Sequence, residues 1–239
     1  MSAPPPPALR RRLPWALISI IALSVAGAVI FNVQMRRTVL KRDIPVRNTI
    51  TGDLAATERT GRVVRLSELR GKVVVCAYVY TVCPHGCAAV VGEMQKLFKR
   101  HGSRPDFHLV SLAVLPDHDT TEFLSAYAEG LGLKPADPWW FLTGNREEIW
   151  NYMDRQLLLT PSVPIPPEER LNPLDTHEHD LRVVLIDRAS RIRGYYSVFH
   201  PQTEIAELMQ ERLEADTLAL LEDPDTCYTP TIVHSQPEM

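Results

Sequence analysis

Two cysteines four positions apart are the residues of this chain best placed to do chemistry. Cys83 and Cys87 follow an apolar run and enclose Pro84-His85-Gly86. Thiolates attack disulfides and also bind soft metal ions, so the pair is either a redox couple or part of a metal site. A thioredoxin redox motif has two residues between its cysteines instead of three, which makes ordinary dithiol exchange the weaker interpretation.

A metal site requires a third ligand, and the chain offers several histidines for that role. Two cysteines with one histidine suit Cu(I), whereas a closed structural zinc site has four ligands. His177 and His179 are the main candidates, because both precede a predicted strand that the fold would bring against the cysteine loop. We expect His85 to face solvent or to tune the thiols, and His118 to belong to a turn and helix cap.

The two remaining cysteines have no comparable setting. Cys76 lies inside the apolar run and is expected to behave as a small, inert, buried hydrophobic residue. Cys227 lies near the end of the chain and is interpreted as incidental. The chemistry therefore depends on the loop between the strand and the helix.

The segments around that loop predict an α/β unit. Residues 73–80 are apolar, β-branched and aromatic, which is typical of a central strand covered on both faces. Apolar residues then recur at helical spacing from Cys87, and residues 107–114 form the next predicted strand. Such a βαβ unit places the cysteine loop at the carboxyl end of a strand, where open α/β sheets carry their sites.

Downstream, the pattern continues as that of one domain. Helices are predicted from Asp119 or Thr120 and after Asn145, then strands over 181–186 and 192–198, and a last helix from about Thr203. The bulky run Trp139-Trp140-Phe141-Leu142 is assigned to the core, and the proline-rich residues 159–173 to an extended surface loop. The order β, α, β, two helices, β, β, α is that of a thioredoxin-like domain.

The N-terminal part of the chain has a different composition. Residues 13–33 contain no charge, and as a helix they would span a hydrocarbon layer of about 30 Å. We predict an uncleaved transmembrane anchor there, with a cleaved signal peptide as the alternative, since Ala26-Gly27-Ala28 resembles a cleavage site. Arginines flank both sides of the segment, so the charge pattern does not fix its orientation.

These patterns give the domain organisation and the fold class. The fold is predicted to be α/β and thioredoxin-like, preceded by one N-terminal transmembrane helix. The predicted parts are a disordered lead (1–12), the anchor (13–33), a linker (34–48), the thioredoxin-like domain (49–222) and a flexible tail (223–239).

The charge balance excludes one class of partner. Residues 1–37 carry five arginines and no acid, which leaves 21 basic against 29 acidic residues in the remainder. A negatively charged domain is a poor match for nucleic acid. No nucleic-acid partner is therefore expected.

Several motifs together resemble those of the Sco/SenC family. The resemblance runs from about Leu66 to Tyr196. Its motifs are Leu66-Ser67-Glu68-Leu69-Arg70-Gly71-Lys72, Tyr80-Thr81-Val82-Cys83-Pro84-His85-Gly86-Cys87, Asp119-Thr120, Phe141-Leu142-Thr143-Gly144, and His179 eight residues before Asp187. Members of this family are thioredoxin-like copper proteins, tethered to the membrane and needed for assembly of the CuA centre of cytochrome c oxidase.

The resemblance implies a site and a function. By position, the copper ligands, for Cu(I) or Cu(II), are Cys83, Cys87 and His179, with His177 as a neighbour. The implied function is that of a metallochaperone, which delivers copper to the CuA-bearing subunit of cytochrome c oxidase or to another cuproprotein. The implied location is the inner (cytoplasmic) membrane, as a single-pass protein with its soluble domain in the periplasm or an equivalent compartment.

Two other functions stay open beside this one. The first is thiol:disulfide oxidoreductase activity, in which Cys83 and Cys87 reduce cysteines of the copper acceptor without His179. The second is a redox sensor. A non-enzymatic copper chaperone is favoured, with thiol:disulfide oxidoreductase activity as the enzymatic alternative.

Overall fold

The computed structural model describes residues 17–31 and 44–223, and the chain divides into two units, Met1–Asp43 and Ile44–Met239. In the first unit, residues 17–31 are helical. Within the described ranges, no helix combines the length and the apolar character needed to cross a membrane. The predicted anchor, 13–33, continues past the described helix at both ends. The lead 1–12, Cys227 and all of the predicted tail after Asp223 lie outside the described residues.

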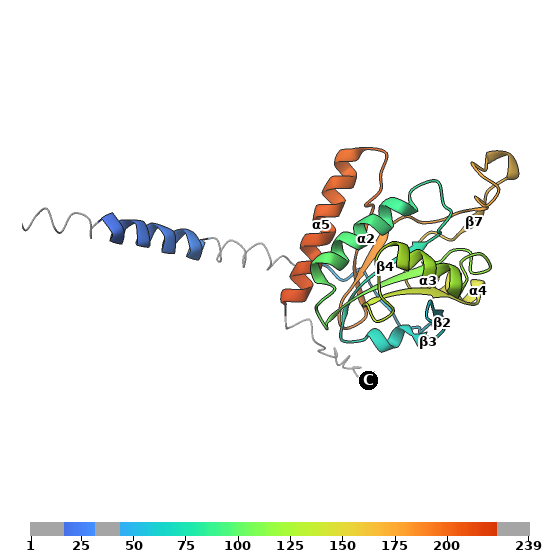
Figure 1. Cartoon of the computed structure of the whole chain (residues 1–239), viewed down its shortest axis with the longest axis horizontal. Coiled ribbons are helices and arrows are strands. Elements are labelled where there is room, and N and C mark those ends of the chain that lie inside the picture. The colour runs from blue at the N-terminus through green and yellow to red at the C-terminus, as the bar shows by residue number, and fades with distance from the viewer. Residues whose placement is uncertain (1–16, 32–43, 224–239) are drawn as a thin grey trace, which may run out of the picture. The chain divides into compact units, whose positions relative to one another are not determined.

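The second unit is built on a mixed β-sheet (Figure 1). Over residues 44–223 the sheet has eight strands in the order β1-β10-β9-β4-β5-β6-β2-β3, and a separate pair is formed by β7 and β8. In chain order the strands are β1 (Asn48–Thr49), β2 (Ala55–Glu58), β3 (Val63–Arg65), β4 (Val73–Val79), β5 (Phe107–Ala113), β6 (Trp139–Thr143), β7 (Val163–Pro164), β8 (His177–Glu178), β9 (Val183–Ile186) and β10 (Arg191–Tyr196).

The central strands β4, β5 and β6 are parallel, and the flanking strands pair antiparallel to them and to one another. Every residue of β4 and β5 is buried, as expected for strands covered on both faces. The helices are α2 (Cys87–His101), α3 (Thr121–Gly130), α4 (Arg146–Arg155) and α5 (Thr203–Glu222), with short 3-10 turns η1 (Leu66–Leu69) and η2 (Pro167–Glu169).

Two layers of helix and loop cover the sheet. Helices α2 and α5 lie side by side (Figure 1), joined by a contact between His101 and Glu214. The other layer is a core cluster in which Tyr152 and Met153 of α4 pack with Val74 and Cys76 of β4. Strand β4 is fully buried, so the loop that follows it starts from a packed strand.

Most predicted elements are present, with several differences. Strand β6 was predicted only as core: Trp139 and Phe141 are indeed fully buried, but as part of a strand. Strands β1, β2 and β3 were not predicted, because each is short and pairs at or near an edge of the sheet, where the apolar pattern is weak. In the motif before β4, Ser67 lies in η1 and donates its hydroxyl to Asp53 at 2.7 Å.

Some residues assigned from the sequence to the linker 34–48 contact the sheet. Ile44 is buried, and its carbonyl oxygen accepts a 2.9 Å hydrogen bond from Nε of Arg193. Asn48 opens β1, which pairs with β10. The chain is thus held to the sheet from Ile44 onward.

Candidate metal centre

The loop after β4 places the two cysteines in different surroundings. The backbone N–H of Cys83 donates to the carbonyl of Tyr80 at 3.0 Å, which turns the chain directly after the strand. Cys87 is the first residue of α2 and is buried, whereas Cys83 is half-buried. The backbone N–H groups of His85 and Cys87, at the start of this helix, hydrogen bond to the sulfur of Cys83 and favour its thiolate form.

The apex of the loop requires glycine because of a close approach. A Cβ atom at Gly86 would meet the ring of Phe199 and the side chain of Leu181. These two residues come from the segments on either side of β9 and β10 and pack over the loop. The absence of a side chain at Gly86 therefore lets the C-terminal part of the domain cover the start of α2.

His179 reaches the cysteines from a segment 92 residues further along the chain than Cys87. It directly follows β8, which is paired with β7 in the proline-rich segment. Its Nδ1 lies 3.0 Å from the backbone carbonyl of Asp180, and a carbonyl oxygen only accepts hydrogen bonds. Nδ1 therefore carries the proton, and the lone pair of Nε2 faces the sulfur of Cys87 at 3.2 Å.

Two aromatic rings fix the orientation of this imidazole. Tyr78 and Tyr80 make edge contacts with His179, each with ring centroids 5.8 Å apart. The neighbouring Asp180 is held by an ion pair with Arg182 at 2.5 Å and accepts the backbone N–H of Thr160. These contacts hold the imidazole in place against the cysteine loop.

Together these residues form a group that could hold a metal ion. The ligand atoms of Cys83, Cys87 and His179 all lie within 4.8 Å of one another, and no other such group is found among the described residues. Metals bound by nitrogen and sulfur at about 2.0–2.3 Å need ligand atoms at about this separation. Two sulfurs and one imidazole nitrogen form the soft donor set that favours Cu(I).

The pKa values of the two thiols are shifted in opposite directions. A hydrogen bond from the Cys87 thiol lowers the pKa of Cys83 against the opposing effect of burial, and the backbone N–H groups of His85 and Cys87 lower it further. The same hydrogen bond, with the burial of Cys87, raises the pKa of Cys87. The thiolate charge therefore resides on Cys83, the more exposed of the pair.

Two clefts flank the group. The first, of about 320 Å³, is lined by Cys83, His85, Ile165, Glu169, His177, Glu178, His179 and Leu181. The second, of about 380 Å³, lies along Asp180, Arg182 and Phe199 and also reaches His179. Cys83 lines only the first of these clefts, so a molecule approaching that sulfur enters there.

The other histidines singled out in the sequence have different partners. His177 bonds through Nδ1 to the hydroxyl of Thr176 at 2.9 Å, and its ring packs on Trp150. His118 bonds to Asp119 at 3.0 Å within the predicted turn, while the cap of α3 is Thr120. Neither histidine belongs to the cysteine group.

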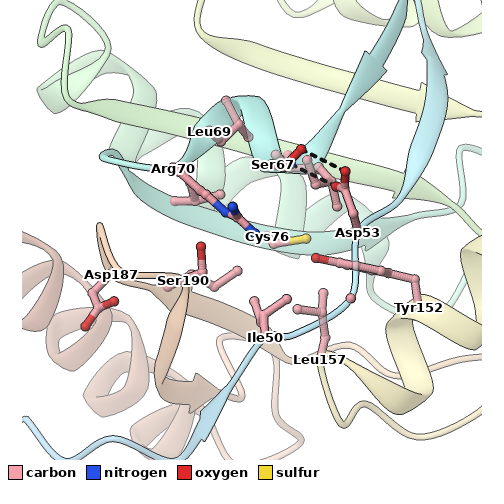
Figure 2. A pocket seen from close by; sticks show the side chains of 15 residues that line it. Ile50, Asp53, Ser67, Leu69, Arg70, Cys76, Tyr152, Leu157, Asp187 and Ser190 are labelled. Atoms are coloured by element: carbon pink, nitrogen blue, oxygen red, sulfur yellow. Dashed lines mark hydrogen bonds between the residues drawn. The ribbon is translucent and has the colours of Figure 1, made fainter. Parts of the chain in front are cut away.

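Cys76 lies apart from the group, on the core face of β4. Its thiol is fully buried, and burial raises its pKa to about 12. It lines a cavity of about 40 Å³ together with Tyr152 and Leu157 (Figure 2). These features agree with the expected role of an inert core residue.

Sequence reasoning missed two residues that hold the site together. Asp175 is fully buried beneath the proline-rich segment and hydrogen bonds to His85. Tyr80 was read as the end of a strand, yet its hydroxyl bonds to Leu174 and Thr176 near that aspartate. The only signal was an acidic residue close to His177 in a loop, which does not by itself indicate burial.

A mixed α/β domain with two cysteines at the start of a helix and a histidine on the facing segment defines a thioredoxin-like protein with a candidate Cys2His metal centre. The family model described as SCO1/SenC matches residues 42–214. The chain therefore belongs to the SCO1/SenC family, and the resemblance seen in the sequence is confirmed.

Solved structures agree on the fold. An SCO1/SenC family lipoprotein from Bacillus anthracis str. Ames is 23% identical, with a TM-score of 0.61 over 74% of this chain and 98% of that chain. Bradyrhizobium japonicum ScoI, solved with copper bound, is 21% identical, with a TM-score of 0.52 over 68% and 98% of the two chains.

A third structure is BsSco, described as a member of the Sco family of cytochrome c oxidase assembly proteins. It is 21% identical, with a TM-score of 0.54 over 73% of this chain and 97% of that chain. A comparison with curated protein sequences found no match. At these identities, the likeness to solved structures establishes the fold alone.

Proposed function

We propose that this protein is a membrane-anchored copper metallochaperone that delivers copper to the CuA site of cytochrome c oxidase or to a similar cuproenzyme. The observation that carries the proposal is the convergence of Cys83, Cys87 and His179 from two distant segments. Family membership and the copper-bound relative from Bradyrhizobium japonicum support copper as the cargo. Copper is held here as cargo that must leave again.

The unequal exposure of the ligands gives a route for transfer. Cys83 is half-buried and lines the 320 Å³ cleft, whereas Cys87 is buried. An acceptor thiolate or imidazole entering that cleft would replace Cys83 first. His179 and Cys87 would then release the metal to the second and third ligands of the acceptor, with transfer driven by the acceptor's greater affinity.

We further propose that residues 13–33 anchor the protein in the inner membrane, with the domain in the periplasm or an equivalent compartment. The uncharged composition of this segment supports the proposal, as does the helix over its described part, 17–31. A reporter enzyme active only outside the cytoplasm, fused after Met239, should be active in membrane fractions. An active cytoplasmic reporter at the same position would contradict the proposed topology.

Thiol:disulfide oxidoreductase activity is a second candidate function, favoured by the exposure difference between the thiols. In this reaction the Cys83 thiolate attacks a disulfide of the acceptor and forms a mixed disulfide. Cys87 then attacks Cys83, and the acceptor leaves with both of its cysteines reduced. Two electrons pass from the Cys83–Cys87 pair, which becomes a disulfide, and His179 is not required.

The two functions separate in one transfer experiment. The full-length protein is loaded with Cu(I) and mixed with a metal-free CuA domain, and the copper content of each protein is measured after separation. We expect copper to move to the acceptor from the parent and from His177→Ala, and His179→Ala, left with two sulfur ligands, to hold copper more weakly and to deliver less of it than the parent. The same variants are assayed, without copper, for reduction of an acceptor disulfide.

The chaperone and the oxidoreductase predict different results in these two assays. Dependence of copper transfer on His179, but not on His177, supports the chaperone. If no copper leaves the parent and His179→Ala reduces the acceptor disulfide as fast as the parent, the chaperone proposal fails in favour of the oxidoreductase.

A further inference from the structure

His85 connects the cysteine loop to a buried carboxylate on another segment. Its Nε2 lies 3.1 and 2.9 Å from the two carboxylate oxygens of Asp175. The side chain of His85 is 42% exposed, whereas that of Asp175 is 0% exposed. An ionised carboxylate only accepts hydrogen bonds, so Nε2 of His85 is the donor. The backbone N–H of His85 also donates to the sulfur of Cys83 at 3.4 Å.

The carboxylate of Asp175 is fixed independently of His85. One of its oxygens accepts the backbone N–H of Leu171 at 3.1 Å. On either side of it, the hydroxyl of Tyr80 donates to the carbonyl of Leu174 and accepts the N–H of Thr176. Asp175 is thus a rigid anchor point, and a histidine bonded to it has a defined position.

This contact joins the two halves of the metal centre. On one side, His85 lies between Cys83 and Cys87 in the loop. On the other, Asp175 precedes His179 by four residues, and the segment between them includes β8. The side chains of His85 and Asp175 therefore link the cysteine loop to the segment that carries His179. This link does not involve Cys83, Cys87 or His179 themselves.

We propose that the pair of His85 and Asp175, here called the latch, positions Cys83 and His179 for copper before the metal arrives. This inference rests on the proposed function. A loop of three residues between two cysteines has freedom that copper binding would otherwise have to remove, and the latch removes it in advance. With Nε2 bonded to Asp175, His85 acts as a positioning residue and not as a ligand.

The test is a double-mutant cycle on the full-length protein, with Cu(I) affinity measured by competition with a chromophoric chelator. His85→Ala should lower the affinity about 10-fold, within the range found for loss of outer-shell partners of metal ligands. Asp175→Ala should have a similar effect, and His85→Ala in that background should cause no further loss. His85→Gln keeps a nitrogen donor near the position of Nε2 and should restore most of the affinity.

Two sets of variants distinguish an effect of the latch on the copper ligands from a general loss of protein stability. His101→Ala removes another histidine–carboxylate contact, to Glu214, at the far end of α2. It should lower the melting temperature but leave the Cu(I) affinity unchanged. Because His85 is partly exposed, His85→Ala and His85→Gln test the latch even if Asp175→Ala does not fold.

The results distinguish the latch from the proposed function. If the parent binds Cu(I) and His85→Ala binds it equally tightly, the latch is wrong and the chaperone proposal stands. Loss of affinity in both His85→Ala and His85→Gln, or additive losses in the cycle, also contradicts the latch. If the parent itself fails to bind Cu(I), the proposed function fails first.

Discussion

Replacing Cys83 by serine should lower the affinity of the protein for Cu(I) by more than about 100-fold. The change removes one of two sulfur donors and substitutes a hard hydroxyl that Cu(I) binds poorly. Loss of an outer-shell partner lowers metal affinity about 10–100-fold, and loss of a direct ligand should lower it further. Competition with a chromophoric Cu(I) chelator measures the effect, with circular dichroism to confirm that the fold is retained.

Cys76 provides the matched control for this experiment. It is also a free thiol, but it is fully buried on the core face of β4 and lies outside the ligand group. Cys76→Ala should therefore bind Cu(I) as tightly as the parent while lowering the free energy of unfolding. Equal Cu(I) affinities in Cys83→Ser and the parent would show that Cys83 is not a ligand.

Replacing His108 by leucine should make the protein markedly more stable in acid. His108 is buried in β5, and within the described residues neither ring nitrogen has a hydrogen-bond partner. Burial, with the positive charges of Lys72, Arg59 and Arg62, lowers its pKa from 6.5 to about 3. The imidazole is therefore neutral where the unfolded chain would be protonated.

The sign of the pH effect follows from proton binding. Between pH 6.5 and about 3 the unfolded chain binds a proton at His108 that the folded chain does not, so the free energy of unfolding falls as the pH falls. The resulting loss in the free energy of unfolding is about 2 kcal/mol at pH 5 and about 4 kcal/mol at pH 3, and it is absent above about pH 7.5. His108→Leu removes it. At pH 8 the variant should be as stable as the parent or up to about 1–3 kcal/mol more stable, because no unpaired ring nitrogen stays buried.

Urea unfolding of parent and variant at pH 8 and pH 5 measures the difference. His101→Leu is the matched control, since His101 is also buried but bonds to Glu214 at 3.1 Å. That substitution should lower the free energy of unfolding, because it removes the hydrogen bond between His101 and the partly buried Glu214. A His108→Leu variant that is less stable than the parent at pH 5 would contradict the assignment of a neutral, unpaired imidazole.

Local patterns were enough to predict the part of the fold that carries the cysteines. Residues 73–80 are uninterrupted by polar side chains, and apolar residues recur at helical spacing after Cys87, so β4 and α2 were both expected. The cap of α4 was also expected, and the side chain of Asn145 accepts the N–H of Glu148 at 3.0 Å. These elements depend on sequence neighbours, which a single sequence contains.

The features that were missed depend on contacts between distant segments. Asp175 is buried where His85 bonds to its carboxylate and Tyr80 bonds to its neighbours Leu174 and Thr176, both from 90 or more residues away. His108 was not singled out from the sequence, yet it is buried because β5 lies inside the sheet and Trp140 packs against its ring. Neither position has a local pattern that distinguishes a buried polar residue from an exposed one.

The choice of His179 as the candidate third ligand also depended on more than local sequence patterns. The residues alone left His177 and His179 open, and the family resemblance implied His179. In the structure, Nε2 of His179 faces Cys87, while His177 turns to Trp150. The two histidines are two residues apart in the chain, and only the path of the chain around β8 separates their surroundings.

X-ray absorption spectroscopy at the copper edge tests most directly whether Cys83, Cys87 and His179 bind copper. The sample is the full-length protein loaded with one equivalent of Cu(I). We expect two sulfur ligands and one imidazole nitrogen in the parent, two sulfurs without the imidazole in His179→Ala, and an unchanged spectrum in His177→Ala. A spectrum of the parent without an imidazole contribution, or one that loses it in His177→Ala, would contradict a copper centre formed by Cys83, Cys87 and His179.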